Sequence, residues 1–182
     1  MHKDLYRGIA HMLELKPDDD LLDVACGSGH FLSKYAADAR TVTGLDLSEV
    51  GIEMARKNNA KRVAAGTAEF VQADASEFPW EAGRFSVVTE MSCLALFSEP
   101  VETLKEMHRV LRPGGRMVLC IPLNAEDGKD HSRVFRKYGY RIWSEHEVRA
   151  LVREAGFPDP QITYDSGHSM PRIMLVRAAK TD

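Results

Sequence analysis

The segment from residue 21 to residue 32 constrains the fold of this chain more than any other. It reads LLDVACGSGHFL: an apolar run that ends in an acid, two glycines one residue apart, and an apolar segment that begins a helix. Gly27 and Gly29 let the backbone turn sharply and approach a ligand without a Cβ in the way. The N–H groups that begin the next helix favour an anionic group in the same space. The segment therefore predicts a strand–loop–helix unit that holds a ligand.

Two common nucleotide-binding patterns do not fit this loop. A dinucleotide-binding loop has a third glycine where this chain has Leu32, and a P-loop has Gly-Lys-Ser/Thr where the first lysine is Lys34. What fits is a ligand with a carboxylate and a nearby cation, because Asp23 stands just before the loop. S-adenosylmethionine (AdoMet) carries a carboxylate, an ammonium and a sulfonium, and no phosphate. The loop therefore indicates AdoMet as the cofactor.

The bulk composition predicts one domain over residues 1–182 and excludes several classes of protein. The net charge of -3 argues against a broad basic surface for nucleic acid. No apolar run reaches membrane-spanning length, and the charged N-terminus does not resemble a secretory signal. Cys26, Cys93 and Cys120 lie in apolar contexts without metal-ligand spacing, which indicates buried free thiols and no metal site. We therefore expect a cytoplasmic protein without a membrane segment.

Strand-like and helix-like segments alternate along the chain. Strands are predicted near residues 20–25, 41–46, 69–73, 84–90, 116–122, 161–165 and 172–178, and helices near 3–16, 29–38, 48–61, 99–112 and 144–155. This alternation predicts βαβ units and a mostly parallel sheet. The last two strands have no helix between them, so we expect an antiparallel pair at one edge. Residues 17–20 are expected to cut the first helix off from the core, and residues 112–115 to turn the chain into the fifth strand.

Six short segments, in this order and spacing, carry a resemblance to a known family. They are LDVACGSG at 22–29, VTGLDLS at 42–48, FVQADA at 70–75, RFSVVTE at 84–90, LKEMHRVLRPGG at 104–115 and EAGF at 154–157. The chain resembles a class I AdoMet-dependent methyltransferase of the small UbiE-like type. The resemblance implies an α/β, Rossmann-like fold with helices on both faces of a seven-stranded sheet. It also implies the strand order 3-2-1-4-5-7-6 with strand 7 antiparallel, and S-adenosylhomocysteine (AdoHcy) as the product.

Two acids at strand ends are candidates for binding the adenosine part of AdoMet. Asp46 ends the second strand about 20 residues after the glycine loop, where an acid can accept hydrogen bonds from both ribose hydroxyls. Its alternative role is a charge at the start of the next helix. Leu47 would then lie against the adenine ring. Asp74 could accept from the adenine amino group, with the N–H of Ala75 donating to a ring nitrogen, or it could be a solvated turn residue.

Asp23 would contact the methionine ammonium or brace the glycine loop. The full set of predicted cofactor-binding residues is Asp23, Ala25, Gly27, Gly29, Asp46, Leu47, Asp74, Ala75 and Glu90. All of them stand at or just after predicted strand ends, where open α/β sheets bind ligands.

The acceptor side is expected to come from residues 90–97, from the loop 123–141 and from the first helix. Glu90, His131 and His168 are the candidate catalytic residues. Glu90 could be a base, could bind a cation, or could be a polar strand end that is bonded to backbone. Many relatives carry a histidine pair near position 96, and this chain does not. Residues 1–19, with Tyr6 and His11, are predicted to act as a lid, and the loop 123–141 as a substrate loop.

These features predict an enzyme that transfers a methyl group to a small-molecule acceptor by in-line displacement. Alignment of the two reactants can account for roughly 7–11 kcal/mol of the barrier, so no fixed catalytic triad is required. Two alternatives remain open: an RNA-modifying methyltransferase, and a non-catalytic AdoMet-binding regulatory subunit. The acidic net charge disfavours the first, and the intact glycine loop disfavours the second. A homo-oligomer is compatible with the sequence.

Overall fold

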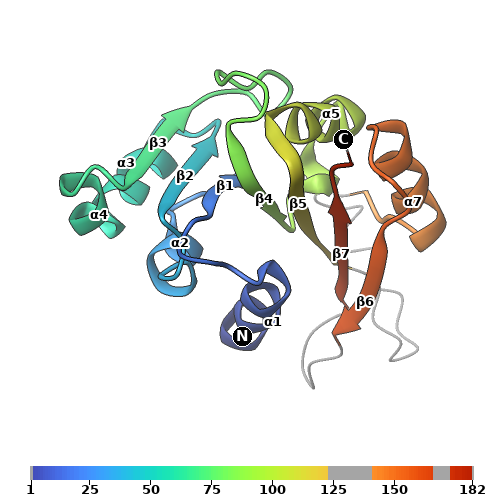
Figure 1. Cartoon of the computed structure of the whole chain (residues 1–182), viewed down its shortest axis with the longest axis horizontal. Coiled ribbons are helices and arrows are strands. Elements are labelled where there is room, and N and C mark those ends of the chain that lie inside the picture. Colours follow the sequence, from blue (N-terminus) through green and yellow to red (C-terminus); the bar gives the residue numbers. More distant parts are fainter. Residues whose placement is uncertain (1, 123–140, 166–172, 182) are drawn as a thin grey trace.

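A seven-stranded sheet forms the centre of the protein, in a computed structural model that describes residues 2–122, 141–165 and 173–181. The strand order is β3-β2-β1-β4-β5-β7-β6 (Figure 1), as predicted. The strands are β1 (Asp20–Val24), β2 (Thr41–Asp46), β3 (Ala68–Gln72), β4 (Phe85–Met91), β5 (Leu111–Pro122), β6 (Gln161–Asp165) and β7 (Ile173–Ala179). The first five pair in parallel, and β7 is antiparallel to both β5 and β6. The predicted fold and its antiparallel edge are therefore confirmed.

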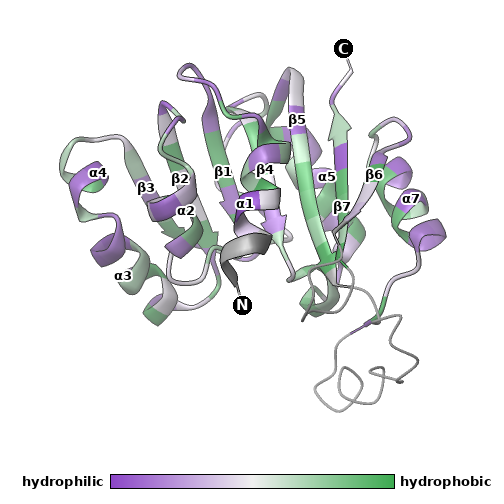
Figure 2. Ribbon diagram, turned by 90° about the horizontal axis from the view of Figure 1, so that it is seen from below, coloured by the Kyte–Doolittle hydropathy of each residue, from purple (hydrophilic) through white to green (hydrophobic). Residues whose placement is uncertain are grey.

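Helices cover both faces of the sheet. They are α1 (His2–Leu13), α2 (His30–Tyr35), α3 (Glu49–Asn58), α4 (Ala60–Ala64), α5 (Pro100–Val110) and α7 (Glu145–Glu154), with a short 3-10 turn η1 (Leu94–Leu96). Apolar residues of α1, α2 and α3 pack on one face of the sheet, and those of α5 and α7 pack on the other (Figure 1). Figure 2 shows the hydrophobic residues gathered on the strands and hydrophilic residues on α4 and α7. Among the described residues, no helix has the length and apolarity needed to span a bilayer.

Two local features differ from the sequence prediction. The helix expected over 48–61 is interrupted at Asn59, whose side-chain amide donates to the carbonyls of Ala55 and Gly29 at 2.9 and 3.1 Å. The segment 112–115 does not precede the fifth strand but lies inside it. There the register with β4 shifts between Phe85 and Val87, so the glycines form a bulge within β5.

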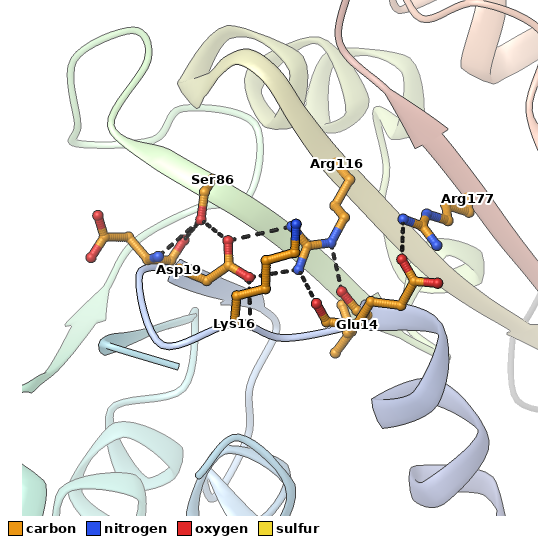
Figure 3. Close-up of polar contacts among 8 residues, drawn as sticks. Glu14, Lys16, Asp19, Ser86, Arg116 and Arg177 are labelled. Atoms are coloured by element: carbon orange, nitrogen blue, oxygen red, sulfur yellow. Dashed lines mark hydrogen bonds and ion pairs between the residues drawn. The ribbon is translucent and has the colours of Figure 1, made fainter. Parts of the chain in front are cut away.

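The first helix is not cut off from the core, contrary to the sequence prediction. Ile9 and Leu13 are fully buried, and the guanidinium of Arg116 on β5 donates to the carbonyls of Leu13 and Glu14 at 2.6 and 2.8 Å. Asp19 orients that guanidinium through a 2.6 Å ion pair (Figure 3). These bonds satisfy carbonyls at the end of α1, so the helix is fixed to the sheet at its C-terminal end.

Candidate functional site

A cavity of about 320 Å³ opens at the C-terminal ends of β1, β2 and β3. This volume lies at the low end of the roughly 300–1,000 Å³ typical of ligand pockets. Five predicted cofactor-binding residues line it: Ala25, Asp46, Leu47, Asp74 and Ala75. The other lining residues are Leu45, Ala73, Ser76, Cys93, Leu96, Phe97, Ser98, Glu99 and Thr103. The fold therefore brings the predicted adenosine-binding residues together in one hollow.

Asp46 connects the cavity to the glycine loop. Its Oδ2 accepts from the N–H of Gly27 at 2.7 Å, and its Oδ1 accepts from the N–H of Ser48 at 2.8 Å. Each carboxylate oxygen has a second lone pair, so the group can still accept from two ribose hydroxyls. Ser48 caps α3 by accepting from the N–H of Gly51 at 3.1 Å. Asp46 thus both lines the cavity and holds the glycine loop in place.

The outer rim of the cavity is exposed. Leu47 lines the cavity although its apolar side chain is 68% exposed. The exposed side chain is free to cover a flat ring. Asp74 is exposed as well, and its Oδ1 accepts from the N–H and the hydroxyl of Ser76 at 2.8 and 2.7 Å. These bonds hold the pKa of Asp74 below its ordinary value. The other carboxylate oxygen is the one that could accept from a ligand.

Asp23 lies under the glycine loop and does not line the cavity. It is fully buried, and neither of its carboxyl oxygens has a hydrogen-bond partner among the described residues. Burial raises its pKa well above the ordinary value, and the nearby acids Glu90 and Asp46 raise it further. Such an uncompensated acid is costly and indicates a ligand group as its missing partner.

Glu90 is fully buried at the end of β4 and also lies outside the cavity lining. One oxygen, Oε1, accepts from the N–H groups of Cys93 and Leu94, at 3.1 Å for Leu94. Its Oε2 has no partner among the described residues. Burial raises the pKa of Glu90 to about 8, against the effect of its two N–H bonds. Glu90 therefore holds the turn into η1 in place. Cys93, just before η1, and Leu96, at its end, line the cavity.

The first helix reaches the site with Tyr6. The Tyr6 ring packs against Phe31 and Tyr35 on α2, with centroids 5.7 and 5.5 Å apart. Burial raises the pKa of Tyr6, and the nearby Asp23 adds to the shift. His11 is exposed near the other end of α1. The closure of residues 1–19 as a lid stays a prediction.

Other predicted residues of the acceptor side fall outside the described part of the chain. These are His131, His168 and the loop 123–141 up to residue 140. Arg141 is described, and its guanidinium lies 3.8 Å from the ring centre of Trp143 and 3.3 Å from Glu147. It is therefore engaged in packing α7.

Sequence reasoning missed part of the cavity wall. Ser98, Glu99 and Thr103 line it from the start of α5. The only sequence signal for this wall was Pro100, which favours a helix start just after the acceptor segment. Within the described residues, no cluster of His, Cys, Asp and Glu could hold a metal ion. Cys26, Cys93 and Cys120 are free thiols; Cys26 and Cys120 are buried as predicted, whereas Cys93 is only partly buried.

The residues of the site fit AdoMet. The cavity lining contains three acids and no Lys, Arg or His, which suits a ligand with cationic groups and no phosphate. Gly27 has a φ of +52°, and a Cβ there would meet no atom within 4 Å, so the loop has open space beside it. Asp23, the predicted contact of the ammonium group, has two carboxyl oxygens without a partner among the described residues.

The two glycines of the loop should respond differently to alanine. A Cβ on Gly29 would lie 2.8 Å from Asn59 Nδ2 and 2.9 Å from Ala55 Cβ, so Gly29→Ala should lower the free energy of unfolding by roughly 2–4 kcal/mol. Gly27→Ala should cost only about 1 kcal/mol of left-handed strain but weaken AdoHcy binding. Gly66→Ala is the control, because Gly66 has a φ of +69° and no neighbour within 4 Å. Equal urea midpoints for all three variants would contradict this assignment.

Glu90 should make the stability of the free protein depend on pH. The folded protein keeps the Glu90 proton up to about pH 8, whereas the unfolded chain releases it near 4.5. The stabilising contribution is therefore fully present below the lower value and is lost as pH rises through the higher one, on the order of 5 kcal/mol in total. Urea unfolding at about pH 6 and about pH 9 should show a larger loss for the wild-type chain than for Glu90→Gln. If the free energy of unfolding fell by the same amount between the two pH values in both proteins, Glu90 would not be the source of the pH dependence.

Comparisons with known proteins agree with the geometry. The model of the family described as "Methyltransferase domain" matches residues 22–119. The chain is 34% identical to 27-O-demethylrifamycin SV methyltransferase of Amycolatopsis mediterranei, over 86% of this chain and 60% of that protein. It is 37% identical to demethylmenaquinone methyltransferase of Lactococcus lactis, over 65% of this chain and 47% of that protein. The chain thus spans about half to three fifths of the length of these curated relatives.

A solved structure with the same fold is geranyl diphosphate C-methyltransferase of Streptomyces coelicolor, in complex with Mg²⁺, geranyl diphosphate and AdoHcy. It superposes with a TM-score of 0.82 at 15% identity, over 99% of this chain and 79% of that one. At this level of identity the likeness establishes the fold, and function is argued from the site.

Proposed function

The chain belongs to the class I AdoMet-dependent methyltransferases, and from this membership we propose that it transfers the methyl group of AdoMet to a small-molecule acceptor. The observation that carries the proposal is the cavity beside the glycine loop, where Asp46 and Asp74 face a hollow without any cationic lining residue. The methyltransferases of rifamycin and menaquinone type named above support a small molecule as the acceptor.

Each part of the site has a distinct task in this proposal. Asp46 accepts hydrogen bonds from the ribose hydroxyls, and Leu47 covers the adenine ring. Asp74 accepts from the adenine amino group, and the N–H of Ala75 donates to a ring nitrogen. Asp23 accepts from the ammonium. AdoMet itself supplies an already activated methyl group on its sulfonium. The protein therefore has mainly to align an acceptor with that methyl group and to exclude water.

Glu90 is our proposed general base. Its pKa of about 8 is close to neutral pH, so part of the Glu90 population is ionised there, and the ionised carboxylate takes a proton from an acceptor hydroxyl or amine. The partnerless Oε2 is the atom that would receive the proton. His131 and His168 remain alternative bases, and we propose that residues 1–19 and 123–141 close the acceptor side.

The test uses AdoMet labelled in its methyl group. Purified protein is incubated with labelled AdoMet and either the small-molecule fraction or the RNA fraction of a cell extract. We expect the label in the small-molecule fraction and none with an Asp46→Ala control. Label only in RNA would favour the RNA-modifying alternative. Tight AdoHcy binding by calorimetry with no label in either fraction would favour the non-catalytic one.

A further inference from the structure

A second hollow lies between α2 and the junction of α3 with α4, on the face of the sheet that these helices cover (Figure 1). Its volume is about 570 Å³, within the roughly 300–1,000 Å³ typical of ligand pockets. Among the described residues, its lining has no member in common with that of the cofactor cavity. The molecule therefore offers a hollow that the methyl transfer proposed above does not use.

This hollow, called the basic groove from here on, is lined by Lys57, Lys61 and Arg62 and by no acid of the described residues. Lys57 and Lys61 are exposed, and none of the three cations takes part in an ion pair with another described residue. The cofactor cavity has the opposite character, with three acids and no cation in its lining. Unpaired cations around one hollow favour an anionic ligand, which the cofactor cavity would repel.

Arg62 is held in a fixed position at one side of the groove. Its Nη2 donates to the carbonyls of Ala36, Ala37 and Ala39, at 3.1, 2.9 and 3.0 Å. Its Nη1 is buried and has no partner among the described residues, although a buried donor without an acceptor is costly. Because the guanidinium is already ordered, an acceptor that reaches Nη1 from the groove loses little affinity to ordering the side chain.

Asn59 supplies the groove with an acceptor. Its side chain is buried, and Nδ2 donates to the carbonyls of Gly29 and Ala55 at 3.1 and 2.9 Å. Because the amide is planar, Oδ1 is directed away from those two carbonyls, and it is buried with no partner among the described residues. A ligand that satisfies both orphaned atoms needs acceptor oxygens for Arg62 and a hydrogen-bond donor for Asn59.

We propose that the basic groove binds a phosphate monoester of a hydroxylated compound, such as a sugar phosphate. A phosphate monoester carries about 1.5 to 2 negative charges at neutral pH and three strong acceptor oxygens, which match two lysines and the free Nη1 of Arg62. A hydroxyl of the same ligand donates to Asn59 Oδ1. A long nucleic acid is disfavoured as the ligand, because the cations are confined to one hollow in a chain of net charge -3.

The groove is connected to the glycine loop through two neighbouring amides. Asn58, which also lines the groove, donates to the carbonyl of Ser28 at 2.9 Å, and Asn59 donates to that of Gly29. A ligand hydroxyl that donates to Asn59 Oδ1 polarises the amide and strengthens its N–H bonds to the loop. Occupation of the groove should therefore tighten cofactor binding, and the cofactor should tighten the groove ligand by the same factor. This coupling rests on the function proposed above, whereas the groove itself does not.

Calorimetry of the full chain in a buffer without phosphate tests the groove, with ribose 5-phosphate as the probe. We expect a dissociation constant below about 1 mM, and no binding of ribose, which lacks the phosphate. Sulfate has no donor for Asn59 and should bind at least about tenfold more weakly.

Lys61→Glu should weaken ribose 5-phosphate by roughly tenfold or more, because it replaces a charge-assisted bond with repulsion. Lys34→Glu is the matched control, since Lys34 is an exposed lysine of α2 outside the groove lining, and it should change the affinity by less than about twofold. A thermal melt checks that each variant is folded, and Lys57→Glu repeats the test from a second lining position.

The same titration in saturating AdoHcy separates the two sites. Ribose 5-phosphate should still bind, and roughly threefold or more tightly. Competition between the two ligands would place the probe in the cofactor cavity and overturn the groove. So would equal effects of Lys61→Glu and Lys34→Glu, or a failure to bind ribose 5-phosphate, whether or not a single-stranded RNA oligonucleotide binds. An affinity unchanged by AdoHcy would overturn the coupling alone. Failure of the protein to bind AdoHcy would refute the proposed function, and the groove would stand if ribose 5-phosphate still bound.

Discussion

Replacing Asp46 with alanine is expected to reduce the affinity for AdoHcy by roughly 10²–10⁴-fold. The carboxylate is expected to make two charge-assisted bonds to the ribose, at about 1.5–3 kcal/mol each. It also fixes the loop, through 2.7 and 2.8 Å bonds from the N–H groups of Gly27 and Ser48. Alanine removes the ribose acceptors and both bonds to the backbone. Calorimetry with AdoHcy measures the change.

Asp74→Ala is the matched control for Asp46→Ala. Both acids line the same cavity, but Asp74 is exposed and its bonds are local ones to Ser76. We expect its loss to weaken AdoHcy by no more than about tenfold, as for one partly solvated bond. Equal effects of the two substitutions would show that Asp46 has no special place in the site. A thermal melt of each variant checks that the fold is retained.

Arg116→Ala should lower the free energy of unfolding by roughly 3–5 kcal/mol, because it leaves Asp19 buried without its cation. The two side chains are only 12% and 3% exposed, and the Arg116 Nη2 lies 2.6 Å from Asp19 Oδ2. Burial alone would raise the pKa of Asp19, but the bonds from Arg116 and Ser86 lower it. The substitution also frees the carbonyls of Leu13 and Glu14 (Figure 3). Urea unfolding measures the loss of unfolding free energy, and hydrogen exchange should show that the loss of protection is concentrated in α1.

Arg84→Ala provides the comparison for Arg116→Ala. Arg84 lies 3.9 Å from Asp20 and its side chain is 43% exposed, so the pair is screened by water. Arg84→Ala should lower the free energy of unfolding by less than about 1 kcal/mol. If the two substitutions cost the same, the ion pair between Arg116 and Asp19 does not hold the first helix to the sheet.

Local patterns predicted most of the fold and part of the cavity lining. The glycine loop and Asp46 could be placed because a strand end, a turn and a helix start are each encoded by neighbouring residues. The helix expected near residues 144–155 could be predicted for the same reason, and α7 begins there with a capping box formed by Ser144 and Glu147. Parallel pairing then brings separate strand ends to one edge, so Asp74 could be added from a segment far along the chain.

The parts that were missed depend on distant or tertiary contacts. Asp19 and Arg116 are 97 residues apart, and neither has a local pattern that marks it as a partner of the other. Asn59 interrupts a helix because its amide reaches the loop carbonyl of Gly29, which no helical periodicity reveals. For Glu90, the sequence could not choose between a base and a strand end bonded to backbone. The structure shows that one oxygen is bonded to backbone and the other is not.

The attachment of α1 has a consequence for the order in which the protein is assembled during synthesis. The helix leaves the ribosome before the strands of the sheet, but Arg116, which fixes its end, is made about a hundred residues later. Arg177, which bonds Glu14 at 2.7 Å, follows only with β7. The strands β1 to β4 can pair before either arginine is made, and Tyr6 can pack against Phe31 and Tyr35 as soon as α2 forms. The C-terminal end of α1 must wait for contacts of high sequence separation. The nascent chain would therefore acquire its glycine loop early, and the end of the helix that carries Tyr6 would be fixed to the sheet among the last steps.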